Sequence, residues 1–156
     1  MARDPYADIF KLSAGHELET QLIDVFGIHF TKKGKVLSTS EFRFATSQED
    51  RELGTDAFIY GLPCDFTCNF AGKNHMIDLH INVDLPGIGL VRFGVRTGNG
   101  RVKFETPVLV IGIETEGYFS KSFIPNIIDS ISHKIDDIIN VGQEAYWNCC
   151  DELNLA

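Results

Sequence analysis

The sequence predicts a single α/β domain, in which one mixed central β-sheet is packed against an N-terminal and a C-terminal helix. A helical pattern of apolar residues spans residues 7–26, several strand patterns follow, and an isoleucine-rich helical stripe closes the chain. The run from Val108 to Ile113 is continuously apolar, which is typical of a central strand covered on both faces. One layer of helices against a sheet buries both the isoleucine stripe and this run.

The composition is that of a globular protein with a real core. The 156 residues suit one domain covering 1–156, with 44% hydrophobic and 23% charged residues. The chain has no run of about 18 apolar residues and no apolar signal region at its start, so we expect a cytoplasmic protein without membrane spans. The net charge of −8 argues against extensive phosphate contacts, although Arg92, Arg96, Arg101 and Lys103 could form a local basic strip.

The N-terminal third combines one helix with a polar connection. Within the helical pattern of residues 7–26, Ser13-Ala14-Gly15 is a possible break, and Gly27 is a suitable stop. Residues 40–52 are polar and rich in acids, which predicts a solvated loop or a short helix.

The middle of the chain carries the strand patterns. Phe58–Tyr60 and Cys64–Phe70 predict a hairpin, with turn residues at Gly61-Leu62-Pro63 between them. Residues 76–83 alternate in polarity, which predicts a half-buried strand whose apolar face holds Ile77, Leu79, Ile81 and Val83. Further strands are expected over residues 89–95 and 107–113, with a turn at residues 97–100 and a hairpin continuing over 101–104.

The C-terminal third predicts the clearest helix. Pro125 suits its first turn, Ser122 is a possible cap, and Gly142 is expected to end or kink it. The apolar stripe that would pack on the sheet consists of Ile127, Ile128, Ile131, Ile135, Ile138, Ile139 and Val141.

Cysteines and aromatic residues raise two further possibilities. Cys64, Cys68, Cys149 and Cys150 could form a four-thiolate zinc site, but the spacing is not the usual C-x2-C and free thiols are the first expectation. Tyr146 and Trp147, together with the vicinal cysteines, could form a homodimer contact near the C-terminus. A protein partner is therefore one possible interaction.

Two acids on the hairpin form the main chemical candidate. Asp56 opens the first strand and Asp65 lies on the second, so a short turn would bring them toward the same end. Two adjacent carboxylates repel each other unless a cation lies between them. Carboxylate oxygens are ligands for divalent metals, and a bound Mg²⁺ or Mn²⁺ would activate water for attack on a phosphodiester.

The hairpin resembles the core of the PD-(D/E)XK nucleases, the restriction-endonuclease-like superfamily. Thr55-Asp56 is similar to the family's Pro-Asp, and Asp65-Phe66-Thr67 to its Asp/Glu-x-Lys. The order of helix, hairpin, further strand and closing helix is also similar, over roughly residues 10–115. The resemblance implies a restriction-endonuclease-like core, a metal bound by Asp56 and Asp65, and cleavage of DNA or RNA.

The same resemblance implies further site residues and exposes one departure. Glu17 or Glu19 on the first helix could match the helical acid that many members add to the metal site, with Glu49 as a competing candidate. In the family, a lysine completes the site beside these acids. Position 67 is a threonine in this chain, and a threonine cannot supply a positive charge at the phosphate.

Two residues could replace the missing lysine. Lys73 follows in the next turn and could reach back, and Arg96 could supply the cation from a neighbouring strand. If neither does so, the same fold would serve as a catalytically silent interaction protein. A small acidic inhibitor of a nucleic-acid-binding protein is a third class, which rests on the net charge of −8.

Overall fold

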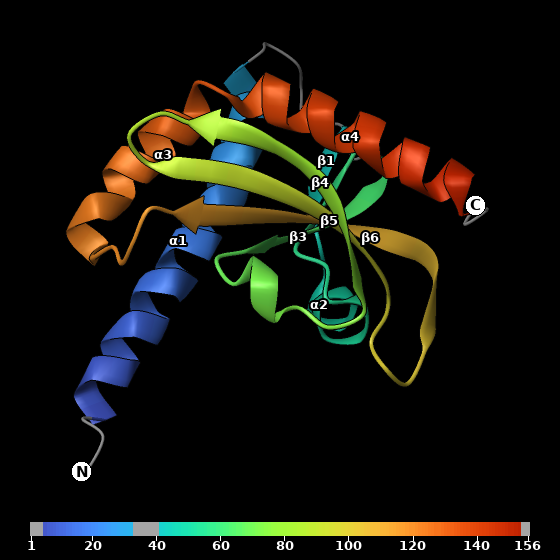
Figure 1. The fold of residues 1–156 in the computed structure, drawn as a ribbon, viewed down its shortest axis with the longest axis horizontal. Helices are drawn as coiled ribbons and strands as arrows, with labels where there is room; N and C mark the ends of the chain where they lie inside the picture. Colours follow the sequence, from blue (N-terminus) through green and yellow to red (C-terminus); the bar gives the residue numbers. More distant parts are fainter. Residues whose placement is uncertain (1–4, 33–40, 154–156) are drawn as a thin grey trace.

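The computed structural model describes the backbone of residues 5–32 and 41–153, and the side chains of residues 14–31 and 41–153. Helices and strands follow one another along the chain as expected for an α/β protein (Figure 1). The helical elements are α1 (Pro5–Lys32), α2 (Ser47–Leu53), η1 (Phe70–Gly72), η2 (Lys121–Phe123), α3 (Ile124–Ser132) and α4 (Ile135–Glu152). The strands are β1 (Phe42–Phe44), β2 (Ala57–Ile59), β3 (Leu62–Thr67), β4 (Met76–Leu85), β5 (Gly89–Gly98) and β6 (Lys103–Thr115).

The six strands form one mixed sheet in the order β1-β2-β3-β6-β5-β4. Strands β3 and β6 pair in parallel, with Cys64 opposite Leu109, whereas the other neighbours pair antiparallel. The predicted central strand is therefore confirmed, because β6 lies between β3 and β5 and both of its faces are covered from Pro107 to Ile113.

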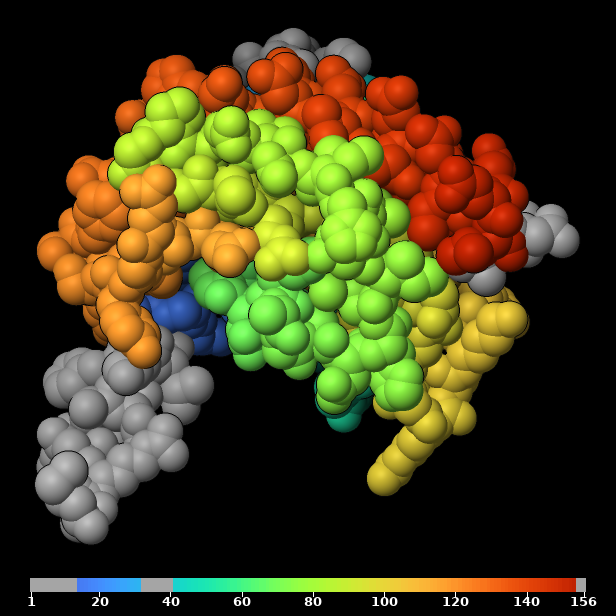
Figure 2. All heavy atoms as spheres, in the orientation of Figure 1, coloured from blue at the N-terminus to red at the C-terminus, as the bar shows by residue number. Residues whose placement is uncertain are grey.

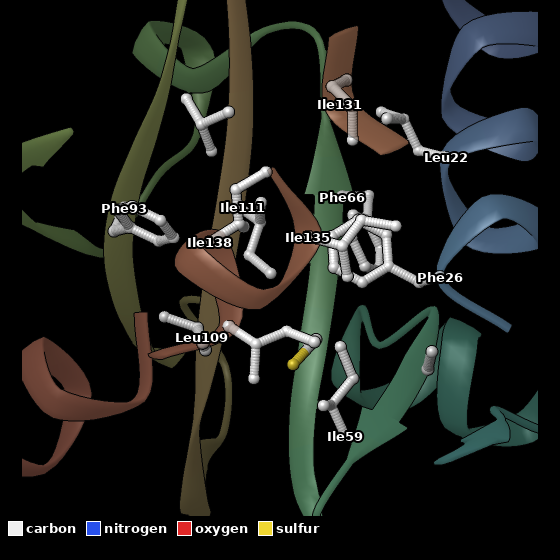
Figure 3. Close-up of a cluster of buried hydrophobic side chains, with 14 of the residues drawn as sticks. Leu22, Phe26, Ile59, Phe66, Phe93, Leu109, Ile111, Ile131, Ile135 and Ile138 are labelled. Atoms are coloured by element: carbon white, nitrogen blue, oxygen red, sulfur yellow. The ribbon is translucent and has the colours of Figure 1, made fainter. Parts of the chain in front are cut away.

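One face of the sheet carries the main core. Helices α1, α3 and α4 cover it (Figure 1), and side chains from all three meet the sheet there. In Figure 3, Ile135 and Ile138 of α4 lie between Phe93 and Leu109 of the sheet on one side and Phe26 of α1 on the other. Burial of this apolar surface is the main stabilising contribution to the fold.

The opposite face is covered more thinly, and this position matters for the site. The short helix η1 packs there through Phe70, whose ring fills the space above Gly112 on β6; a Cβ atom at Gly112 would lie only 2.6 Å from that ring. Helix α2 lies beyond the edge of the β2–β3 hairpin and has no buried residue. Side chains at the centre of this second face are nevertheless buried, among them Asp65, Thr67 and Val110.

The helices differ from the sequence prediction at three points. Helix α1 passes through Gly15 and Gly27 without a break, since no bulky side chain is required at either position to continue it. The C-terminal helix is divided at His133-Lys134, where α3 ends and α4 begins. Gly142 does not end α4: it allows the Phe93 ring to approach to within 2.9 Å of where a Cβ atom would lie.

The helix α3 begins without the expected cap. Phe123, and not Ser122, occupies the N-cap position, and it makes no side-chain capping hydrogen bond. Pro125 lies in the first turn as predicted, because its missing N–H is not needed there.

The strands also depart from simple alternation. A register shift between Asp78 and Asn82 in β4, with His80 at φ 54°, turns Ile81 outward, so that it is 42% exposed and not on the apolar face. The β2–β3 turn is formed by Tyr60 and Gly61, both at positive φ, and not by residues 61–63.

The aromatic and cysteine cluster near the C-terminus is largely internal. Tyr146 is 1% exposed and its hydroxyl donates a 2.7 Å hydrogen bond to the carbonyl of Pro107, while Cys149 and Cys150 are also buried. Trp147, at 52% exposed, is the member of this group that faces solvent. Across the part of the chain that the structure describes, no helix combines the length and apolarity needed to cross a membrane.

Candidate active site

The β2–β3 hairpin places Asp56 and Asp65 next to each other. Ala57 is opposite Cys64, and the Asp56 N–H donates a 2.8 Å hydrogen bond to the Cys64 carbonyl, which extends the pairing by one residue. Side chains alternate along a strand, so Asp65 lies on the face opposite to the core residue Cys64. The two acids thus lie together on the thinly covered face of the sheet, as the sequence predicted.

The environment of this acid pair favours the protonated form of Asp56. Asp65 is 6% exposed, and Asp56 Oδ2 accepts a 2.8 Å hydrogen bond from the Phe66 N–H. Burial raises the pKa of Asp56 to about 7; the Phe66 N–H opposes this rise, and the nearby Asp65 carboxyl adds to it. Near neutral pH Asp56 therefore holds its proton in part of the molecules, and a metal ion would have to displace that proton.

Thr67 begins the turn that returns the chain to the acids. The Thr67 hydroxyl accepts a 2.9 Å hydrogen bond from the Asn69 N–H, which closes a tight turn at the end of β3. Helix η1 follows, anchored by Phe70 on Gly112, and Lys73 follows η1 directly. Thr67 thus helps to shape the loop that carries Lys73.

Lys73 reaches Asp65 from this loop. Its Nζ lies 2.9 Å from Asp65 Oδ2, and the two side chains are 28% and 8% exposed. The two atoms are at ion-pair distance, but their angles are not those of a hydrogen bond. Asp65 Oδ2 therefore has no hydrogen-bond partner among the described residues. Asp65 therefore has its positive neighbour at the same buried oxygen, Oδ2, that has no hydrogen-bond partner among the described residues.

Arg96 lies on the same sheet face but makes different contacts. Its guanidinium is 5.9 Å from the centre of the Phe104 ring, and Nη1 lies 2.7 Å from where a Cβ atom at Gly54 would be. Its Nε is buried and has no hydrogen-bond partner among the described residues. Arg96 thus approaches the loop that precedes Asp56 without an ion pair of its own.

The proposed third acids take up other roles. Glu19 Oε1 accepts a 3.1 Å hydrogen bond from the Cys68 N–H just beyond β3, and Glu17 lies 3.5 Å from Lys121 in an exposed ion pair. Glu49 is held by a bidentate contact with Arg43, which lowers the pKa of Glu49 to about 2. Glu49 also completes the capping box of α2 with Thr46.

The residues that could bind a metal are therefore fewer than the sequence predicted. No group of three or more His, Cys, Asp or Glu side chains arranged for one metal ion is found within residues 14–31 and 41–153. The four cysteines are free thiols, and Cys68 contacts α1 through the Gly15 carbonyl. The acids that the structure brings together are Asp56 and Asp65.

A groove beside the acid pair was not predicted from the sequence. It has a volume of about 820 Å³ and lies between α2 and the β5–β6 hairpin, whose tip stands away from the body of the protein (Figure 2). Phe58, Pro63 and Phe104 contribute apolar surface, and Arg51 and Lys103 contribute positive charge. The sequence contains no signal for it, because elements far apart along the chain form its walls.

Comparisons of this chain with protein-family models, curated proteins and solved structures found no match.

Proposed function

We propose that this protein is a divergent, metal-dependent nuclease-like enzyme that acts on nucleic acid phosphodiesters, built on a restriction-endonuclease-like core. The observation that carries the proposal is the cluster of Asp56, Asp65 and Lys73 on one sheet face. The order of α1, the β2–β3 hairpin, the further strand β6 and the closing helix α4 also supports it.

The acid pair suits a Mg²⁺ or Mn²⁺ ion. Asp56 and Asp65 are adjacent carboxylates, and two carboxylates with bound water and substrate oxygens are a common ligand set for Mg²⁺. When bound, such an ion would activate water and stabilise negative charge on the phosphate. Asp56 and Asp65 would hold it, and Glu17 and Glu19 would act outside its ligand set.

Lys73 supplies the charge that Thr67 lacks. Its ammonium lies beside Asp65, where the family's lysine would be needed, but it arrives from the loop after η1 and not from β3. Lys73 would position a phosphate oxygen and stabilise the negative charge on that oxygen. This electrostatic role requires a cation that is held in place before the reaction. Arg96 would contact the phosphate from the other side of the acid pair.

A cleavage assay tests this proposal. Single- and double-stranded DNA and RNA are incubated with the protein and Mn²⁺, and the parent is compared with Asp65→Asn and with the exposed control Asp84→Asn. We expect cleavage by the parent and the control, and loss of cleavage in Asp65→Asn and in EDTA. Cleavage that persists unchanged in Asp65→Asn would contradict the proposal.

A catalytically silent interaction protein on the same fold is the second candidate. One observation favours it: Lys73 already neutralises Asp65, and no third acid joins the pair among the described residues. On this alternative, the ion pair stabilises a buried polar cluster and nothing is cleaved. The absence of cleavage in every substrate above, together with no metal binding, would favour it.

A further inference from the structure

The groove between α2 and the β5–β6 hairpin adjoins the acid pair along the sheet. Phe58 and Pro63 are cross-strand partners that line the groove, and Asp56 and Asp65 form the next pair on the same face. Residues two apart on a strand are about 7 Å apart, so the floor of the groove leads directly to the two carboxyl groups.

Arg96 lies beside the groove, next to its lining residue Phe104, and is not itself one of the lining residues. It pairs with Val108 on β6, and Val108 precedes Leu109, the partner of Cys64 on β3. From β5 its side chain therefore extends across the sheet face, past the Phe104 ring that lines the groove, to Gly54. Glycine at position 54, with φ +59°, leaves the space that the guanidinium occupies.

The guanidinium has an unused hydrogen-bond donor at this position. A buried N–H group without a partner carries a desolvation cost, which an anionic ligand would remove. Arg96 Nε is such a group among the described residues, whereas the nearby Arg43 and Arg92 already pair with Glu49 and Asp78. Arginine is also well suited to planar, bidentate recognition of phosphate.

The walls of the groove favour a short ligand over a long polyanion. They carry two basic residues, Arg51 and Lys103, against three acidic ones, Glu49, Glu52 and Glu105, of which Glu49 is neutralised by Arg43. A long nucleic acid needs many cationic contacts, which this surface and a net charge of −8 do not provide. A volume of about 820 Å³ lies in the range of small-molecule sites.

We infer that the groove binds one nucleoside phosphate, either a free nucleotide or the unpaired end of a strand, with its phosphate at Arg96 and its base against Phe104, since the Arg43 guanidinium already covers the Phe58 ring at 3.8 Å. Aromatic side chains stack on bases of any sequence. This inference rests on the proposed function, for which it names the substrate as a short or single-stranded phosphate ester delivered to Asp56 and Asp65.

The test is an NMR titration of the full chain in EDTA, with AMP, adenosine and a 5′-phosphorylated tetranucleotide as probes. AMP is expected to shift the amide signals of Lys103, Phe104 and Thr106, and to bind at least about tenfold more tightly than adenosine, because a charged hydrogen bond is lost without the phosphate. The tetranucleotide distinguishes the two sources: tighter binding than AMP indicates a strand end, and weaker binding a free nucleotide.

Variants locate the phosphate. Arg96→Gln is expected to remove the preference for AMP over adenosine, whereas Arg101→Gln, which changes an exposed arginine in the turn of the same hairpin, is expected to keep it. Equal affinity of the parent for AMP and adenosine overturns the inference even if Arg96→Gln does not fold. The nucleotide titration contains no metal, so it tests the groove independently of the metal site. A parent protein that binds Mn²⁺ in a separate titration but does not bind AMP rejects the groove alone. A parent protein that binds AMP but not Mn²⁺ rejects the metal site alone.

Discussion

Lys73 Nζ lies 2.9 Å from Asp65 Oδ2, although the two residues are separated by the end of β3 and by the whole of η1. The turn closed by Thr67 and the packing of Phe70 on Gly112 bring the lysine back over the sheet. The positive charge thus reaches the acid pair through tertiary packing and not through its position in a strand motif.

Replacing Lys73 with glutamine is expected to destabilise the protein. Removing the cation leaves Asp65, which is 8% exposed, without its ion-pair partner. We expect the free energy of unfolding to fall by about 1–3 kcal/mol, since breaking a more fully buried pair costs still more. Urea unfolding at pH 7 measures the change.

Lys121→Gln is the matched control for that experiment. Lys121 pairs with Glu17 at 3.5 Å, but both side chains are about half exposed, at 53% and 43%. Surface pairs of this kind contribute less than about 1 kcal/mol. Equal effects of the two substitutions would show that the contact of Lys73 with Asp65 has no special weight.

The stability of the protein should depend on the protonation of Asp56. The pKa of Asp56 in the folded state is about 7, above the ordinary value of 3.8. Between these two pH values, Asp56 is therefore protonated in the folded state and ionised in the unfolded state. The contribution of this group to stability is therefore complete below pH 3.8 and is lost as the pH rises through 7.

The variant Asp56→Asn isolates this effect. An amide oxygen can still accept the Phe66 N–H, while the buried negative charge is removed. We expect the variant to be more stable than the parent by about 1–2 kcal/mol at pH 8, and to lose this advantage at pH 4. Thermal unfolding across this range is the measurement, and a stability difference that does not change with pH would refute the raised pKa of Asp56.

Two glycines in helices should respond in opposite directions to alanine. At Gly142 the new Cβ atom would meet the Phe93 ring at 2.9 Å, so Gly142→Ala is expected to lower the free energy of unfolding by about 1–3 kcal/mol. At Gly15 nothing lies within 4 Å of the new atom, and Gly15→Ala is expected to raise it by about 0.5–1 kcal/mol. Stabilisation by both substitutions would show that α4 does not pack closely on β5.

Glu19 offers a test of which acids belong to the candidate metal site. Because its carboxylate accepts the Cys68 N–H, the variant Glu19→Gln keeps an acceptor there and should leave Mn²⁺ affinity unchanged. Titration calorimetry of this variant and of the parent checks this. A clear loss of affinity would place Glu19 among the metal ligands.

Much of the fold could be predicted from local patterns. The apolar run from Val108 to Ile113 defined the central strand, and the isoleucine stripe defined the helices that cover it. The helix break at His133-Lys134 and the register shift between Asp78 and Asn82 could not be predicted, because neither contains a glycine or proline signal. Strand β1 was also missed, since its three residues are too few to show a period.

The candidate site divides in the same way. The pairing of Asp56 with Asp65 followed from one hairpin, which is local information. The choice between Lys73 and Arg96 depended on the packing of Phe70, and the roles of Glu17 and Glu19 depended on how α1 lies beside β3. These contacts join distant segments, so spacing along the chain could not determine them.

The most direct test of the central claim is calorimetric titration of the parent with Mn²⁺ at pH 6 in buffers of different ionisation enthalpy. The account predicts binding that releases about one proton per ion, as the proton of Asp56 is displaced. It also predicts loss of this binding in Asp65→Asn and its retention in Asp84→Asn. Absence of Mn²⁺ binding by the parent, or equal binding by Asp65→Asn, would contradict the account.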